Sequence, residues 1–214
     1  FRTAMEGKRG PVHLTIPHDL QEQTVDVEVF QRYEKSVIDD MNNWLTYPNL
    51  NQIEKSLDML SNAKKPVIVA GLGAGATVLR KDLDIFLKNT KIPFFGVDSG
   101  RALVPDSHEC SLGIGYLPLN KSAQRVSESD VVLLLGVKLD YQLGFGGSPP
   151  FNKDAKIICV DPDIEQLNRS RTVSLIVNSD VGPYVELMKQ KSEGINWDNH
   201  EWLKSLKNTK KNYI

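Results

Sequence analysis

Cysteines, long apolar runs and an excess of charge of one sign are scarce or absent in this sequence. Only two cysteines, Cys110 and Cys159, occur in 214 residues, and without a CxxC pair they favour reduced thiols and a cytoplasmic protein. There is no run of about 18 apolar residues, so no membrane span is expected. A formal net charge of −1 gives no basic surface for a nucleic acid, so neither a membrane nor a nucleic acid is an expected partner. The four histidines are scattered without metal-ligand spacing, and no metal site is expected.

Short apolar runs alternate with amphipathic segments along most of the chain. A run without alternation predicts a strand buried on both faces of a sheet, and apolar residues at i, i+4 and i+7 predict a helix face. The predicted strands span residues 10–16, 66–70, 92–97, 131–136, 156–160 and 174–177. The predicted helices lie near residues 53–60, 79–86, 120–129, 181–190 and 195–208. Because alternating strands and helices imply right-handed crossovers, we expect a Rossmann-like α/β fold. Its sheet would be doubly wound, mostly parallel and five- or six-stranded, with helices on both faces.

Composition divides the chain into three segments. Residues 1–29 end in a polar stretch, 17–29, that is expected to be an extended linker. Residues 30–192 hold the regular pattern and form the expected nucleotide-binding domain. Residues 193–214 are either the start of a further domain or a C-terminal extension.

The two ends of the chain bear on whether it belongs to a larger protein. The sequence begins at Phe1 in the middle of a helical phrase, which suggests a fragment of something longer. Near the other end, Trp202 and Leu206 share one face of the predicted helix. They either dock onto another domain or cover the core of this one.

A glycine-rich turn follows the apolar run at 66–70. Gly71, Gly73 and Ala76 fit the pattern G-x-G-x-x-G/A between a strand and a helix, where backbone amides and the positive helix end face a phosphate. Asp98 follows the next predicted strand, where a dinucleotide dehydrogenase places its ribose-binding acid. One hypothesis is therefore an NAD-linked oxidoreductase. The alternative is a turn whose glycines only let the helix pack on the strand.

Four further phrases occur in one order along the chain. They are "GKRGPVHLTIPHDLQ" (7–21), "GRALVPDSHECSLG" (100–113), "SDVVLLLGVKLDY" (129–141) and "KIICVDPDIEQLNRSR" (156–171). Together they resemble the end of the first domain and the middle domain of thiamine-diphosphate-dependent enzymes. The subgroup that they resemble most is the acetolactate synthase large subunit.

The resemblance implies a sheet of the DHS-like NAD/FAD-binding type between two catalytic domains. Residues 1–29 would then be the tail of a pyrimidine-binding domain, and a diphosphate-binding domain would follow. The intact homo-oligomer would use thiamine diphosphate and Mg²⁺ to decarboxylate pyruvate and join the product to a 2-oxo acid, in branched-chain amino-acid biosynthesis. The family's G-D-G…N-N signature and activating glutamate are missing from this chain. It is therefore expected to hold no catalytic residue, to bind FAD or ADP, and to brace the catalytic domains.

The cofactor contacts implied by the resemblance fall on the turns that follow the predicted strands. Backbone groups of the glycine turn would line the phosphate path, and carboxylates would accept hydrogen bonds from ribose or adenine. The implied contacts are Gly71, Leu72, Gly73, Ala74, Lys138, Leu139, Asp140, Asp161, Asp163, Asp180 and Val181. Asp161 and Asp163 have a structural alternative, which is to cap the following helix. Lys138 has the alternative of a solvated side chain.

Two departures from the family pattern bear on the ligand. The stretch "GIGYLPLN" (113–120) stands where acetolactate synthases place G-M-H-G-T beside the flavin, so adenine and diphosphate binding is better supported than isoalloxazine binding. The stretch "DYQLGFGG" (140–147) is similar to that of enzymes that act on CoA thioesters. An oxalyl-CoA decarboxylase or 2-hydroxyacyl-CoA lyase is therefore an alternative, and a structural spacer with an empty pocket is another.

Overall fold

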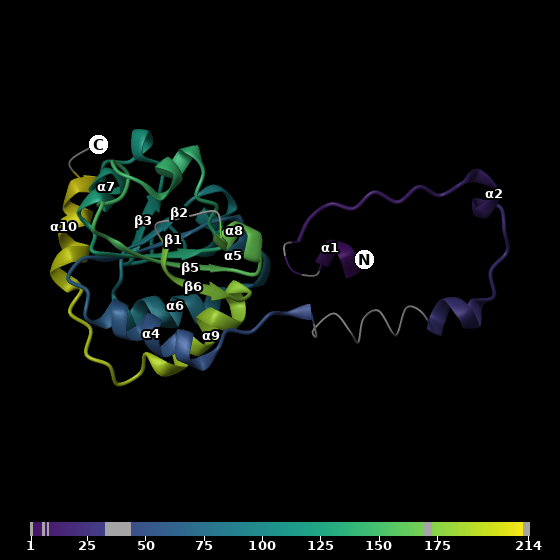
Figure 1. Ribbon diagram of the computed structural model, residues 1–214, viewed down its shortest axis with the longest axis horizontal. Coiled ribbons are helices and arrows are strands. Elements are labelled where there is room, and N and C mark those ends of the chain that lie inside the picture. Colours follow the sequence, from purple (N-terminus) through teal and green to yellow (C-terminus); the bar gives the residue numbers. More distant parts are fainter. Residues whose placement is uncertain (1, 6, 8, 33–43, 169–172, 212–214) are drawn as a thin grey trace. The chain divides into compact units, whose positions relative to one another are not determined.

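The computed structural model describes residues 2–5, 7, 9–32, 44–168 and 173–211 of the chain. Contacts divide the chain into two units, Phe1–Leu45 and Thr46–Ile214, and each is described by itself. The larger unit is a sheet between two layers of helices (Figure 1).

The described part of the smaller unit is helical where it is regular. It contains α1 (Arg2–Met5), α2 (His18–Gln21) and helical residues at 27–32. The strand predicted at 10–16 is wrong, because these residues form no strand and their apolar side chains are exposed. Alternation alone does not make a strand without a partner to supply hydrogen bonds. The extended linker predicted at 17–29 is wrong in part, because α2 lies within it.

The larger unit is built on a sheet of six parallel strands. The strands are β1 (Pro66–Ala70), β2 (Phe94–Gly96), β3 (Ser111–Ile114), β4 (Val131–Leu135), β5 (Lys156–Asp161) and β6 (Val173–Asn178). Their order is β3-β2-β1-β4-β5-β6, and every neighbouring pair is parallel. This order is the doubly wound arrangement, so the predicted fold class is confirmed.

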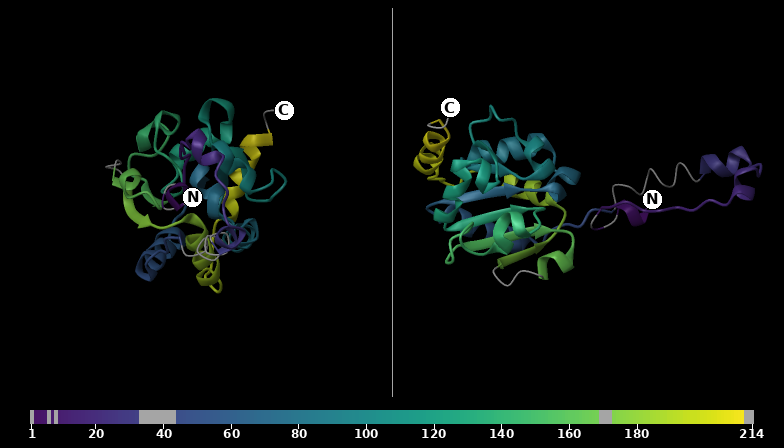
Figure 2. Two further views of the ribbon diagram at one scale, coloured as in Figure 1. Left: turned by 90° about the vertical axis from the view of Figure 1, so that its right-hand side faces the viewer. Right: turned by 90° about the horizontal axis from the view of Figure 1, so that it is seen from above.

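Helices cover both faces of this sheet, as the two further views show (Figure 2). The longer helices are α4 (Leu50–Ser61), α6 (Arg80–Thr90), α9 (Val181–Lys191) and α10 (His200–Lys211). The shorter ones are α5 (Leu72–Thr77), α7 (Lys121–Gln124) and α8 (Ile164–Asn168). Side chains of α4, α6 and α9 share one core cluster, and side chains of α7, α8 and α10 share the other.

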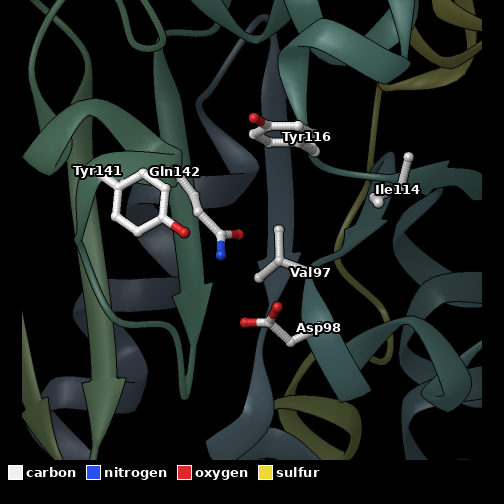
Figure 3. Close-up of a pocket in the computed structure, with 6 residues that line it drawn as sticks. All are labelled: Val97, Asp98, Ile114, Tyr116, Tyr141 and Gln142. Carbon is white, nitrogen blue, oxygen red and sulfur yellow. The ribbon is translucent and has the colours of Figure 1, made fainter.

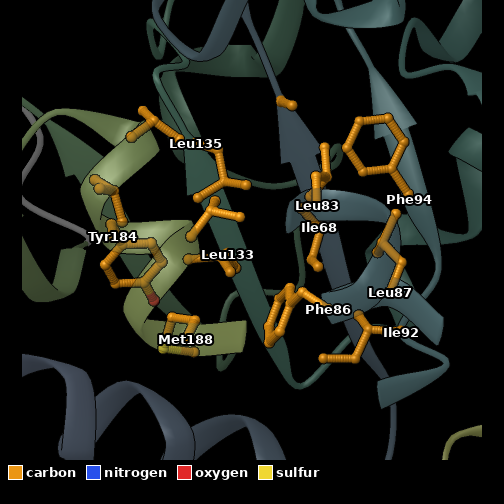
Figure 4. Packing of buried hydrophobic residues seen from close by; sticks show 14 of the residues in the cluster. Ile68, Leu83, Phe86, Leu87, Ile92, Phe94, Leu133, Leu135, Tyr184 and Met188 are labelled. Carbon is orange, nitrogen blue, oxygen red and sulfur yellow. The ribbon is translucent and has the colours of Figure 1, made fainter. Parts of the chain in front are cut away.

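The strand residues alternate between these two clusters even in β1 and β4, which are apolar throughout. In β1, Ile68 and Ala70 belong to the first cluster, whereas Val67 and Val69 belong to the second. Figure 4 shows the first cluster, where Ile68 and two leucines of β4, Leu133 and Leu135, meet side chains of α6 and α9. Burial on both faces explains why the central strands read as continuous apolar runs.

Several predicted elements differ from the observed ones in extent. The helix predicted at 120–129 is α7 followed by a 3₁₀ turn, η4 (Arg125–Glu128), and the helix predicted at 195–208 begins only at His200. The strand β3 was not predicted. None of the described helices has both the length and the apolar composition needed to cross a membrane.

The C-terminal helix α10 packs on the sheet of the larger unit. Trp202 and Leu206 are buried in the second cluster, and the Trp202 indole N–H donates to the Pro66 carbonyl at 3.1 Å. The Ser122 hydroxyl in turn donates to the Leu206 carbonyl at 2.8 Å. Of the two alternatives for this aromatic face, the structure therefore shows that it covers this domain's own core.

Candidate functional site

The turns that carry the predicted cofactor contacts all follow the carboxyl ends of parallel strands. They therefore lie along one edge of the sheet. The strand order reverses between β1 and β4, and in open α/β sheets a ligand binds beside such a switch point.

The glycine turn after β1 is closed by backbone contacts. The amide of Gly71 donates to the Leu135 carbonyl and that of Gly73 to the Gly136 carbonyl, each at 3.0 Å. A Cβ atom on Gly71 would lie 2.7 Å from the Gly136 oxygen, closer than van der Waals contact allows. These glycines let two turns pack together, which is what the packing alternative proposed. The remaining predicted residues of the turn differ in exposure, since Leu72 is 69% exposed and Ala74 is buried.

The predicted residues after β4 face different surroundings. Lys138 is exposed, whereas the half-buried Leu139 packs against the second core cluster. The Asp140 carboxylate accepts from the Gln142 amide at 2.9 Å and starts the 3₁₀ segment η5 (Tyr141–Gly146). Of these three, Lys138 is the residue whose side chain is most open to solvent.

The two aspartates after β5 hold their own turn. The Asp161 carboxylate accepts from the Asp163 amide at 2.8 Å, and the Asp163 carboxylate accepts from the Glu165 amide at 3.0 Å. The second of these bonds caps the first turn of α8. The capping alternative therefore describes at least part of what these side chains do.

Asp180 and Val181 are buried at the start of α9. The Asp180 carboxylate accepts from the Thr46 amide at 2.7 Å, and the Asp180 amide donates to the Thr46 carbonyl at 2.9 Å. Val181 belongs to the first core cluster. Asp180 thus ties the first residues of the larger unit to α9.

A cavity of about 190 Å³ lies beside the switch point. We call it the edge cavity, and it is lined by Val97, Asp98, Ile114, Tyr116, Tyr141 and Gln142. These residues follow β2, end or follow β3, and begin η5. Figure 3 shows the two phenol rings, the Gln142 amide and the Asp98 carboxylate around one space.

None of the predicted cofactor contacts lines the edge cavity, although Asp98 had been noted as a possible ribose ligand. Sequence reasoning missed Tyr116, Tyr141 and Gln142. They lie in the two stretches, 113–120 and 140–147, where the sequence departs from the acetolactate synthase pattern, and that departure is the signal that could have found them. Among the residues that the structure describes, no three His, Cys, Asp or Glu side chains are grouped to hold a metal ion.

The strand order, with helices on both faces of the sheet, defines an open, doubly wound α/β domain with a cavity at one edge. The family model described as "Thiamine pyrophosphate enzyme, central domain" matches residues 53–188. The chain therefore belongs to this family of central domains.

Relatives of the chain include enzymes with two kinds of name, 2-hydroxyacyl-CoA lyases and acetolactate synthase large subunits. It is 29% identical over 180 residues to 2-hydroxyacyl-CoA lyase 1 of Dictyostelium discoideum, a match that covers 82% of this chain and 29% of the relative. It is 27% identical over 225 residues to a probable acetolactate synthase large subunit of Methanococcus aeolicus, covering 100% of this chain and 37% of the relative. A 2-hydroxyacyl-CoA lyase of Arabidopsis thaliana is 30% identical over 165 residues, with 77% and 28% covered. The chain thus spans roughly a third of the length of the curated relatives it matches.

Proposed function

We propose that this chain is the central domain of an acetolactate synthase-like enzyme, in which it holds a nucleotide and braces two catalytic domains. The observation that carries the proposal is the family match over the sheet and both helical layers, together with acetolactate synthases among the relatives. In the whole enzyme, thiamine diphosphate with Mg²⁺ supplies the carbanion chemistry that decarboxylates pyruvate and joins it to a 2-oxo acid. The residues of this chain bind the nucleotide and support the two catalytic domains. The whole enzyme is proposed to be a homo-oligomer.

The nucleotide is proposed to be ADP or the ADP part of FAD. The edge cavity offers phenols, an amide and a carboxylate, which suit a ribose or a base edge. At about 190 Å³ it is smaller than the roughly 300–1,000 Å³ of pockets that enclose drug-sized ligands. It therefore takes part of the nucleotide, and the diphosphate lies toward the exposed Lys138, since the Gly71 and Gly73 amides are bonded to backbone.

The second candidate is a 2-hydroxyacyl-CoA lyase-like or oxalyl-CoA decarboxylase-like enzyme. Lyases of the first kind are among the relatives, and the η5 stretch "DYQLGFGG" (140–147) favours them. The family match supports either candidate over an NAD-linked oxidoreductase. If the domain were only a structural spacer, a ligand assay would detect no bound nucleotide.

The ligand of the purified full chain distinguishes these candidates. We expect an adenine nucleotide to be released when the protein is denatured, and mass spectrometry to identify it. FAD would also absorb in the visible range before denaturation. Release of no nucleotide, together with no binding of added ADP, FAD or coenzyme A in calorimetry, would contradict the nucleotide-holding role.

A further inference from the structure

We infer that the start of α9 is a two-position switch, in which the Asp180 carboxylate accepts from either the Thr46 amide, as in this structure, or the Gly182 amide. The hydroxyl of Thr77, at the end of the helix α5 that follows the glycine turn, sets the choice. A movement of α5 thereby holds or releases the segment by which the chain enters the larger unit. The inference goes beyond the proposed function, because the switch does not require a bound nucleotide.

Thr46, the first residue of the larger unit, is held by the turn between β6 and α9. Its amide donates to the Asp180 carboxylate at 2.7 Å. Its carbonyl accepts from the Asp180 amide at 2.9 Å and from the Ser179 hydroxyl at 3.0 Å. Ser179 and Asp180 are both buried. Because three hydrogen bonds meet at Thr46, the position of the entry segment depends on this one turn.

Asp180 occupies the N-cap position of α9, but its side chain does not cap the helix. Its φ of −59° and ψ of 144° are extended, as at other N-caps, where an aspartate normally accepts from the second or third amide of the helix. The third residue, Pro183, has no amide hydrogen. The second amide, that of Gly182, donates instead to Thr77 Oγ1 at 3.0 Å. The carboxylate is therefore left for Thr46, because a hydroxyl from another helix takes its usual place.

The contact between Thr77 and Gly182 joins α9 to the glycine turn. Thr77 is the last of the six residues of α5, which begins directly after Gly71. A Cβ atom on Gly182 would lie 2.3 Å from the Thr77 carbonyl oxygen, so the backbones of the two helices touch at this point. Because α5 is short and lies between the glycine turn and α9, a displacement of the turn is carried to Thr77 through one rigid element.

The two positions of the switch exchange one hydrogen bond for another. When Thr77 moves away, the Gly182 amide at the helix start needs a new acceptor, and an N-cap aspartate supplies one. Asp180 reaches that amide by a change of side-chain rotamer, since its backbone is already extended. The Thr46 amide then loses its acceptor, and water can replace it because Thr46 is only half-buried. The helix start is kept and the entry segment is released.

The Thr77→Val variant tests the switch, because it removes the hydroxyl and keeps the size of the side chain. Amide hydrogen exchange of the full chain, measured by NMR, follows the two amides separately. We expect the Thr46 amide to exchange at least about tenfold faster than in the wild type, and the Gly182 amide to stay within about threefold. Thr77→Ser is the matched control, since it keeps the hydroxyl and should change neither amide. In the double variant Thr77→Val/Asp180→Ala, the Gly182 amide should also lose its protection, because both acceptors are gone.

Three results with Thr77→Val would overturn the inference. If the Gly182 amide loses its protection while the Thr46 amide keeps it, Asp180 does not change its partner. If both amides lose protection, the start of α9 unfolds locally instead of switching, and if neither changes, Thr77 does not control the turn. Should Thr77→Val fail to fold, as judged by exchange of the β1 and β4 amides, Thr77→Ala removes the same hydroxyl and must give the same pattern. Because no ligand is added, these results are independent of the nucleotide-holding role.

Discussion

A Cβ atom on Gly73 would lie 2.9 Å from the Cα atom of Gly136. The reverse contact is closer still, because a Cβ on Gly136 would lie 2.3 Å from the Ala74 nitrogen. Gly136 also has a φ of +56°, which L residues rarely adopt. The turns after β1 and β4 therefore touch backbone to backbone, and both glycines are needed for that contact whether or not a ligand binds.

Gly73→Ala and Gly136→Ala should therefore destabilise the domain. Overpacking at a backbone contact costs about 1–3 kcal/mol, and Gly136→Ala adds about 1–2 kcal/mol because of its positive φ. The measurement is the free energy of unfolding in urea. Gly75→Ala is the control, since a Cβ at Gly75 would meet only the Ser99 hydroxyl at 3.6 Å, and it should be neutral or stabilising by up to about 1 kcal/mol. Equal stability of the three variants would contradict the contact.

The central strands could be predicted from the sequence because burial on both faces requires continuous apolar residues. β1 and β4 show this pattern without interruption. β3 lacks this pattern and was not predicted, because "SLGI" is short, holds only two large apolar side chains and lies at the edge of the sheet. The strand predicted at 10–16 is the opposite case. Its residues alternate as in a strand, but they form none because no partner strand lies beside them in the described part of the chain.

The site could be predicted only as far as the edge of the sheet. Strand ends are visible in the sequence, so the turns after β1, β4 and β5 were placed correctly. Which side chains surround a common space depends on how separate turns meet, and Tyr116 and Tyr141 meet through such an arrangement. Asp161 and Asp163 also form local hydrogen bonds that a motif match does not reveal.

Asp180→Ala should lower stability through the loss of one long-range hydrogen bond. The variant leaves the Thr46 amide without its 2.7 Å acceptor, and an unpaired polar group of this kind costs about 1–3 kcal/mol. Asp180→Asn keeps an acceptor and should lose less. Urea denaturation gives the stabilities and calorimetry the affinity for ADP. If Asp180 binds the nucleotide instead, both variants would lose affinity at unchanged stability.

Glu128 should make the stability depend on acid pH. Its carboxylate accepts from Arg125 at 2.7 Å and from Lys65 at 3.0 Å. The hydrogen bond from Arg125 is the largest cause that lowers the pKa of Glu128 to about 2. Because the pKa is lower in the folded state, the stabilisation is present above the ordinary pKa of about 4.5 and is lost as the pH falls toward 2.

The Glu128→Gln variant isolates this effect. Since 37% of the Glu128 side chain is exposed, the expected loss at neutral pH is only about 0.2–1 kcal/mol. The difference between wild type and variant in the free energy of unfolding should shrink between about pH 5 and about pH 2.5. A constant difference over that range would show that the charge of Glu128 does not stabilise the fold.

His108 should lose the hydrogen bond that its Nδ1 accepts when it is protonated. Its Nδ1 accepts from the Cys110 amide at 3.0 Å, and its Nε2 lies 3.3 Å from an Asp84 oxygen. The side chain is only 7% exposed, and this burial lowers the pKa of His108 below its ordinary value, although the Asp84 charge opposes the shift. Stability should therefore be present at neutral pH and fall as the pH drops through that lowered pKa.

An NMR titration of the imidazole measures this pKa directly. We expect a value below 6.5, the usual value for histidine, and a proton on Nε2 in the neutral form. Asp84→Asn removes a charge that favours the protonated ring, so it should lower the pKa further. A pKa that rises in Asp84→Asn would contradict the assigned cause.

Trp202 should be the residue that holds α10 on the sheet. Two cations lie near its ring, with Lys65 Nζ at 5.1 Å and Arg125 Cζ at 5.3 Å from the ring centroid, and its indole N–H donates to Pro66. Trp202→Ala removes a buried ring and this bond, which should cost about 3–5 kcal/mol. Trp202→Phe keeps most of the packing and should cost less.

Thermal unfolding and limited proteolysis of α10 distinguish packing within this domain from docking onto a neighbour. In Trp202→Ala the helix should become sensitive to protease before the sheet unfolds, because it keeps only part of its apolar contact, through Leu203 and Leu206, and hydrogen bonds such as that of Ser122 to Leu206. Trp197→Ala is the comparison, since Trp197 is only half-buried and bonds to the nearby Ser192 carbonyl at 3.3 Å. It should therefore cost less than Trp202→Ala. If both variants kept wild-type stability and protease resistance, α10 would not be part of this domain's core, and a contact with another domain would have to explain its apolar face.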